Sequence, residues 1–393
     1  MPHLARRMAS QARKGFGMYE HVMASNRPSD DIIHLHIGRP HHDTPEHIKT
    51  AVKQALDAGI VHYGELSGLG RLREVLAQRY THEHDTQYTP DEILITNGVT
   101  QASFAAFLAL IDDGDEVIVL DPFYPQHNSK IELASGRVIA VPLAVRDGLF
   151  RLDAVALERA VTPRTRMVVL INPSNPTGAV YTREELQQLA DIVARHNLLV
   201  LADEVYEFIT YDSQQHIVFA SLPGMKERTV TVSAFTKAYA MDGWRIGYAA
   251  APKPIIAELR KITMNATTHP NVFAQEGAYT AVVSSQRCVR EMVASDRISR
   301  DLVVSGFNSV PGVRCGVPQG TIYALPDLAV FGIDSSELAI RIFDQTGVAM
   351  EAGTFYGQQS RYHLRVCFGS EPPARVAEAM KRVTAYLTSG DLR

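Results

Sequence analysis

Cysteine is scarce in this chain, which has three cysteines among 393 residues. Cys288, Cys315 and Cys367 lie far apart, and none belongs to a C-x-x-C pair. An odd, scattered set of cysteines is typical neither of a disulfide framework nor of a cysteine-based zinc site, so the sequence argues against both. We expect reduced thiols in the core of a cytoplasmic protein.

Long apolar runs and a strong excess of charge are also absent. No stretch of about 18 apolar residues occurs, so no transmembrane helix is expected. The net charge is −4 at pH 7, and it gives no reason to expect a nucleic-acid or membrane partner. A short basic cluster near the amino end is followed by no apolar segment, so we expect no targeting role for Arg6, Arg7, Arg13 and Lys14.

Histidine, by contrast, is plentiful. The chain has 15 histidines, and five of them fall between positions 34 and 47. Their spacing matches no common ligand motif, so the sequence predicts no metal site.

Short apolar runs alternate with helical stretches along most of the chain. The predicted strands are 93–96, 116–120, 138–141, 167–171, 198–201, 229–232 and 246–250. Helices are predicted at 101–111 and 183–196, and at 45–80 with a glycine-rich interruption. This alternation predicts an α/β fold whose mostly parallel sheet has helices on both faces. The pattern loosens near residue 290, which predicts a large domain over 45–290 and a smaller α/β domain from 1–44 and 291–393.

Polar residues gather where five of these strands end. They occur at 97–98, 121–124, 172–178, 203 and 233–237. Ligands of such sheets bind at the carboxyl ends of the strands, so the pattern predicts one composite site. Unrelated turns would have a similar composition, but they do not account for Lys237.

Seven segments together resemble the class I and II aminotransferases, fold-type-I enzymes that use pyridoxal 5′-phosphate (PLP). In chain order the segments are LHIGRPHHDTPEHIK (35–49), HYGELSGLGRLREVLA (62–77), TNGVTQA (96–102), DPFYP (121–125), NPSNPTG (172–178), ADEVYE (202–207) and SAFTKAYAMDGWRIGY (233–248). The resemblance covers nearly the whole chain. It implies a seven-stranded, mostly parallel sheet with a smaller α/β domain beside it.

The resemblance also implies roles for residues around the cofactor ring. Lys237 would hold PLP as a Schiff base and later move the proton of the substrate α-carbon. Asp203 would keep the pyridinium nitrogen protonated, which makes the ring an electron sink. Asn175 and Tyr206 would hydrogen-bond the phenolic oxygen of the ring, and Tyr124 would stack on it.

A second set of residues would hold the cofactor phosphate. Gly98, Val99 and Thr100 lie where a strand turns into a helix, and a helix amino terminus suits an anion. Arg245 would add a bidentate contact. The family signature has Gly or Ser at position 234, where this chain has alanine, and Ser233 or Thr236 would compensate. Tyr63 matches a tyrosine that reaches the phosphate of the neighbouring subunit, which implies a homodimer with shared active sites.

The substrate side is expected to be less typical. Arg365 and the backbone of Gly38 match the groups that bind the substrate α-carboxylate. The family commonly reads G-E-P-D where this chain has Gly38-Arg39-Pro40-His41. Arg39 would attract an acidic side chain, and His41 is either an additional acid–base group or an exposed loop residue. At this one position the chain is similar to PLP- and oxygen-dependent amino-acid oxidases.

The function predicted from these features is transfer of an amino group between an L-amino acid and a 2-oxo acid. The alternative is another reaction of the same cofactor, namely elimination, cyclisation or O₂-dependent oxidation of an amino acid. A regulatory protein without catalysis is disfavoured because Lys237, Asp203 and Arg245 are all present.

Overall fold

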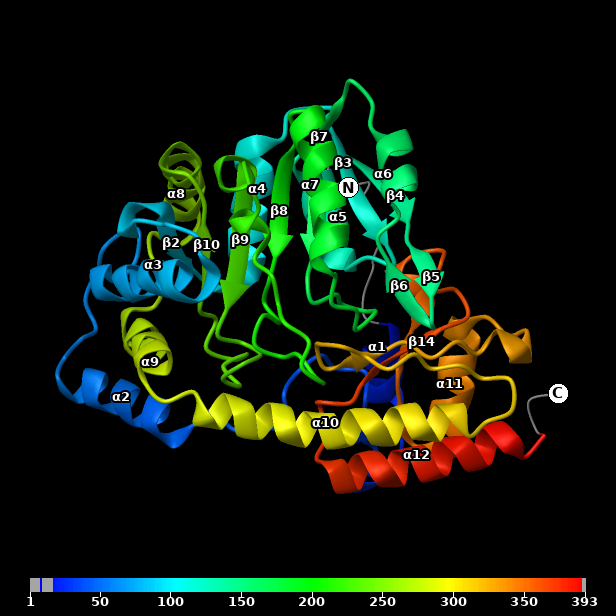
Figure 1. Cartoon of the computed structure of the whole chain (residues 1–393). Coiled ribbons are helices and arrows are strands. Elements are labelled where there is room, and N and C mark those ends of the chain that lie inside the picture. Colours follow the sequence, from blue (N-terminus) through cyan, green and yellow to red (C-terminus); the bar gives the residue numbers. More distant parts are fainter. Residues whose placement is uncertain (1–7, 9–16, 391–393) are drawn as a thin grey trace, which may run out of the picture.

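The computed structural model describes residue 8 and residues 17–390. The basic residues Arg6, Arg7, Arg13 and Lys14 lie outside the described residues. Helices cover a central sheet, and a further layer of helices lies beyond the arrowheads of strands such as β8 and β9 (Figure 1). Within the described part of the chain, no helix has the length and apolar character needed to cross a membrane.

Seven strands form the central sheet, in the order β2-β10-β9-β8-β7-β3-β4. Strand β10 is antiparallel to both of its neighbours, and the other pairs are parallel. The strands are β2 (Ile93–Thr96), β3 (Glu116–Asp121), β4 (Arg137–Pro142), β7 (Thr165–Ile171), β8 (Leu199–Asp203), β9 (Thr229–Ala234) and β10 (Gly247–Ala250). A separate hairpin joins β5 (Ala144–Arg146) and β6 (Leu149–Arg151).

Both faces of the sheet are buried, as the continuous apolar strands predict. In β3, Val117 and Val119 pack into a different core cluster from Ile118 and Leu120, because successive side chains point to opposite faces. One face carries α4 (Gly98–Leu110), α5 (Pro125–Leu133) and α8 (Lys253–Thr267). The other carries α6 (Ala154–Ala160) and α7 (Arg183–Arg195), with α2 (Glu46–Asp57), α3 (Gly70–His84) and α9 (Val272–Val283) near β2 and β10.

A further core cluster joins the two ends of the described chain. It contains side chains from residues 18–35 and from residues 303–387, with Tyr206, Ile209 and Tyr211 between them. Its helices are α1 (Gly17–Ala24), α10 (Arg287–Asn308), α11 (Ser335–Thr346) and α12 (Pro373–Thr388). Its strands are β1 (Ile33–His34), β11 (Tyr323–Ala324), β12 (Val348–Ala349), β13 (Glu351–Ala352) and β14 (Leu364–Cys367). Helix α10 runs beside α12 across the width of the view (Figure 1).

The predicted fold class is confirmed, since all seven predicted strands form and lie in one mostly parallel sheet. Helix α4 begins at Gly98, three residues before the predicted start. The stretch predicted as an interrupted helix over 45–80 is two helices, α2 and α3, with the glycine-rich loop between them. The domain division at residues 44 and 290 stays a prediction.

A buried ion pair ties α3 to the loop after β8. Arg79 donates to both carboxylate oxygens of Glu207, at 2.8 and 3.0 Å, and to the hydroxyl of Tyr248 at 2.8 Å. Ser233 donates to the same carboxylate at 3.0 Å. Burial would raise the pKa of Glu207, but Arg79 holds it below its usual value. The pair therefore compensates two charges that are removed from water.

We predict that Arg79→Met lowers the free energy of unfolding by about 3–5 kcal/mol, because it leaves the Glu207 carboxylate buried without its counter-ion. The matched control is Arg287→Met, which removes an exposed ion pair with Glu291 and should cost less than about 1 kcal/mol. Urea unfolding followed by circular dichroism measures both. Equal losses in the two variants would contradict the prediction.

Candidate active site

A cavity of about 500 Å³ lies at the carboxyl ends of the central strands. Eleven residues singled out from the sequence line it: Gly38, Val99, Thr100, Tyr124, Asn175, Asp203, Tyr206, Thr236, Lys237, Arg245 and Arg365. They come from seven separate segments of the chain, and the strands of the central sheet bring five of these segments to one edge of the sheet.

Lys237 follows β9 and reaches the wall opposite. Its Nζ donates to the backbone oxygen of Gly38 at 2.5 Å. Burial lowers the pKa of this amine to about 8, because the charged form loses its hydration. A substantial fraction of Nζ is therefore uncharged near neutral pH and able to act as a nucleophile or as a base.

Asp203 ends β8 and is 4% exposed. Its Oδ2 lies 3.0 Å from Nε2 of His127, a buried residue of α5. A carboxylate only accepts hydrogen bonds, so Nε2 carries the proton. Burial lowers the pKa of His127, and Asp203 opposes this shift. Sequence reasoning missed His127, although it stands two residues beyond the DPFYP segment.

Three polar side chains stand near this carboxylate on the cavity wall. Tyr206 donates its hydroxyl hydrogen to the hydroxyl of Tyr323 at 2.9 Å, and burial raises the pKa of Tyr206. Asn175 is 6% exposed, and its Oδ1 has no hydrogen-bond partner among the described residues. A buried amide with an unused polar atom is suited to bind a ligand.

The amino terminus of α4 forms another part of the wall. Gly98 has a φ of +77°, and a Cβ added there would lie 2.9 Å from Nη2 of Arg245. The guanidinium therefore packs directly on the first residue of the helix, next to Val99 and Thr100. Unpaired backbone N–H groups and an arginine together favour an anion such as a phosphate.

Arg365 approaches from β14 and is 3% exposed. Its guanidinium carbon lies 4.6 Å from the ring centre of Tyr323 and 4.9 Å from that of Tyr356. Nη2 donates to the backbone oxygen of His36 at 2.6 Å, while Nε has no partner in the described structure. These contacts orient the guanidinium and leave it donors for a carboxylate.

The cavity holds a second lysine, which no sequence motif singles out. Nζ of Lys130, in α5, donates to Oγ of Ser103 at 2.8 Å. Burial lowers the pKa of this amine to about 8 as well. Other lining residues not predicted from sequence include Tyr19, His36, Gln126, Tyr323 and Glu351.

Five predicted residues do not line the cavity, and one of them, Gly98, packs against Arg245 at the start of α4. The hydroxyl of Ser233 is bonded to Glu207 on the other side of β9, which leaves Thr236 beside the cavity. Tyr63 is 91% exposed and packs its ring against His269. Arg39 is exposed and does not line the cavity, so its attraction of an acidic side chain stays a prediction.

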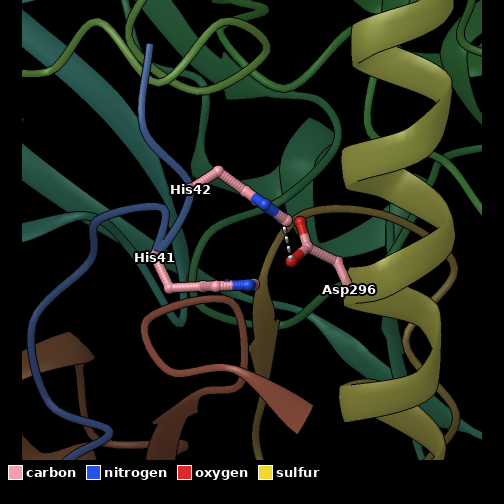
Figure 2. Close-up of side chains that lie close together, drawn as sticks. All are labelled: His41, His42 and Asp296. Carbon is pink, nitrogen blue, oxygen red and sulfur yellow. Dashed lines mark ion pairs between the residues drawn. The ribbon is translucent and has the colours of Figure 1, made fainter. Parts of the chain in front are cut away.

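His41 is also turned away from the cavity. Its Nδ1 lies 3.1 Å from the backbone oxygen of Gly369, and its ring lies 3.8 Å from that of His42. Both imidazoles point toward Asp296 of α10 (Figure 2), and Nε2 of His42 lies 3.6 Å from Oδ1 of that carboxylate. These contacts join the segment after Gly38 to α10.

Known proteins similar to this chain are aminotransferases. The sequence pattern of the family described as aminotransferase class I and II matches residues 30–383. An aspartate aminotransferase of Pyrococcus abyssi is 35% identical over 360 residues, which cover 91% of this chain and 92% of the relative. An aromatic-amino-acid aminotransferase 2 of Thermococcus litoralis is 34% identical over 381 residues, covering 96% and 95%. The structure of a single mutant of the Thermus thermophilus aspartate aminotransferase matches with a TM-score of 0.91 at 33% identity, covering 98% and 99%.

We predict that Lys237 reacts with trinitrobenzenesulfonate with a midpoint near pH 8 in protein freed of small ligands. Only the uncharged amine reacts, and burial makes that form abundant at a lower pH than the value of about 10.4 for an ordinary lysine. Peptide mapping after timed labelling measures the rate at each pH. A midpoint above pH 10 would show that the amine is hydrated.

Proposed function

Because this chain belongs to the class I and II aminotransferases, we propose that Lys237 is the residue that binds PLP covalently. The chain is a PLP-dependent aminotransferase, and the relatives named above act in the same reaction class. When bound, PLP supplies the electron sink that makes the substrate α-proton acidic. The residues below would hold it and direct its reaction.

The phosphate of the cofactor would lie at the amino terminus of α4. Support comes from Arg245, because a Cβ added at Gly98 would lie 2.9 Å from its Nη2, so the guanidinium stands directly beside the first residue of the helix. Backbone N–H groups of Val99 and Thr100 and the hydroxyl of Thr236 would complete the anion site. A serine at position 234 is not needed to contact the phosphate, since the hydroxyl of Thr236 is available at the cavity.

The ring would lie between Tyr124 and the ends of β7 and β8. The Asp203 carboxylate would accept a hydrogen bond from the protonated ring nitrogen. His127 would hold that carboxylate in position through its own hydrogen bond to Oδ2. Tyr206 and the amide Nδ2 of Asn175 would donate hydrogen bonds to the phenolic oxygen. Burial raises the pKa of Tyr206, which keeps its hydroxyl protonated, and Asn175 is 6% exposed.

The substrate would bind with its α-carboxylate on Arg365 and on the backbone of Gly38. This orientation would place the α-carbon near Nζ of Lys237. The uncharged amine would take the α-proton as a base, and the ammonium so formed would give it back as an acid. A pKa of about 8 suits this exchange, because the amine can be both base and acid near neutral pH. The convergence of Lys237, Asp203 and Arg365 on one cavity is the single observation that carries the proposal.

We predict that borohydride reduction of the holoenzyme attaches the cofactor to the peptide that contains Lys237. Lys237→Ala should lose this label and all amino-acid turnover, because no other amine lies at that place. Lys130→Met is the matched control, since Lys130 is also a buried cavity lysine with a pKa near 8. It should keep the label on Lys237. Mass spectrometry of the peptides decides, and a label on Lys130 would overturn the assignment.

The active unit is proposed to be a homodimer. Tyr63 stands on the loop between α2 and α3, is 91% exposed, and lines no part of its own cavity. The resemblance assigns this ring to the phosphate of the neighbouring subunit, and an exposed side chain outside its own cavity is free to reach a partner.

We predict that Lys237→Ala and Tyr63→Phe subunits complement each other. A mixed dimer has one site with both Lys237 and Tyr63 intact, whereas either homodimer has none. The activity of the refolded mixture should therefore exceed the sum of the two separate variants. Equal values, or full activity from a monomer in light scattering, would exclude a shared site.

A further inference from the structure

Glu351 is a second carboxylate on the cavity wall, and none of the contacts proposed so far uses it. It lies in β13 directly opposite Arg365 of β14, so both side chains stand on the same face of this small sheet. Its exposure is 1%, and neither carboxylate oxygen has a hydrogen-bond partner of good geometry among the described residues. It makes no ion pair with Arg365 within 4.0 Å in the described structure.

Burial of this carboxylate is only partly compensated. Burial raises the pKa of Glu351, while Arg365 and the backbone N–H groups of Met18 and Ala352 lower it by less. A buried carboxylate without a full set of partners costs stability, and a cation from a ligand would remove that cost.

The charges of the cavity can be assigned one by one. Asp203 faces His127, Arg245 faces the expected phosphate, and Arg365 faces the expected α-carboxylate. Among the described lining residues, Glu351 is the carboxylate left without a counterpart. An acidic substrate side chain would place a second negative charge near it, whereas a cationic side chain would neutralise it.

We propose that Glu351 binds the side-chain cation of the substrate, so that the amino donor is an amino acid with an ammonium or guanidinium group. This inference rests on the aminotransferase function proposed above. The α-carboxylate of such a donor would bind Arg365, and its side-chain cation would bind Glu351. The two protein charges lie on adjacent strands and would together bind both ends of the substrate.

Glu351 also lies near the amino terminus of α1, where it would stabilise backbone N–H groups even without a ligand. Helix α1 places Tyr19 on the cavity wall, so a loss of this contact would disturb every substrate alike. Selectivity therefore separates the two roles: a binding group changes the ranking of substrates, and a purely structural group does not.

The test is the half-reaction of the holoenzyme with single amino acids, followed through the absorption of the bound cofactor. Wild type should convert faster with L-arginine and L-lysine than with L-norleucine, and slowest with L-glutamate. Glu351→Gln keeps the shape and removes the charge. It should lower kcat/KM for arginine and lysine by about 10- to 100-fold and leave norleucine within about twofold. Glu20→Gln removes an exposed charge from α1 and should leave the ranking unchanged.

Each outcome bears on one claim. A wild-type preference for norleucine or glutamate would overturn the inference, and so would an equal loss for all amino acids in Glu351→Gln. If that variant does not fold, the wild-type ranking still decides. No conversion with any amino acid would instead overturn the proposed aminotransferase function.

Discussion

Removing charges from water is the constraint around which this site is built. The cavity collects two lysines, two arginines and two carboxylates, and all of them except the exposed Arg245 would be destabilising there without compensation. The fold provides that compensation from distant parts of the chain: His127 for Asp203, a backbone oxygen for Lys237, and two tyrosine rings with a second backbone oxygen for Arg365. The same requirement governs the Arg79–Glu207 pair behind the sheet. The cavity-wall groups without a hydrogen-bond partner, which include atoms of Asn175, Glu351 and Arg365, mark where a ligand would bind.

The sequence predicted the parts of this architecture that depend on local pattern. Buried strands read as continuous apolar runs, so all seven strands and their common edge could be predicted. Residues directly after those strands, such as Asp203 and Lys237, follow from position alone. The family resemblance added Arg365, which does not follow a strand of the central sheet and so could not be predicted from the strand ends. These predictions depend on local sequence patterns or on family motifs, so they can be made without knowledge of tertiary contacts.

Other residues could not be predicted because their role depends on which way a side chain points. Ser233 and Ala234 are neighbours in β9, and the hydroxyl of Ser233 faces Glu207 rather than the cavity because alternate strand residues point to opposite faces. His41 looked like part of the substrate mouth, yet its ring is turned toward Asp296, more than 250 positions further along the chain (Figure 2). Glu351 and Lys130 carry no motif at all. Glu351 reaches the cavity wall because it lies in the two-residue strand β13, and Lys130 reaches it from α5.

The short helix α1 has a practical consequence. It begins at Gly17, yet it supplies Tyr19 to the cavity wall and packs against β13, which bears Glu351. Helix α1 is therefore part of the cavity wall rather than an appendage to it. Helix α12, at the other end, contributes no residue to the wall. Shortened versions of this enzyme should therefore keep α1, since its loss would remove Tyr19 from the cavity wall.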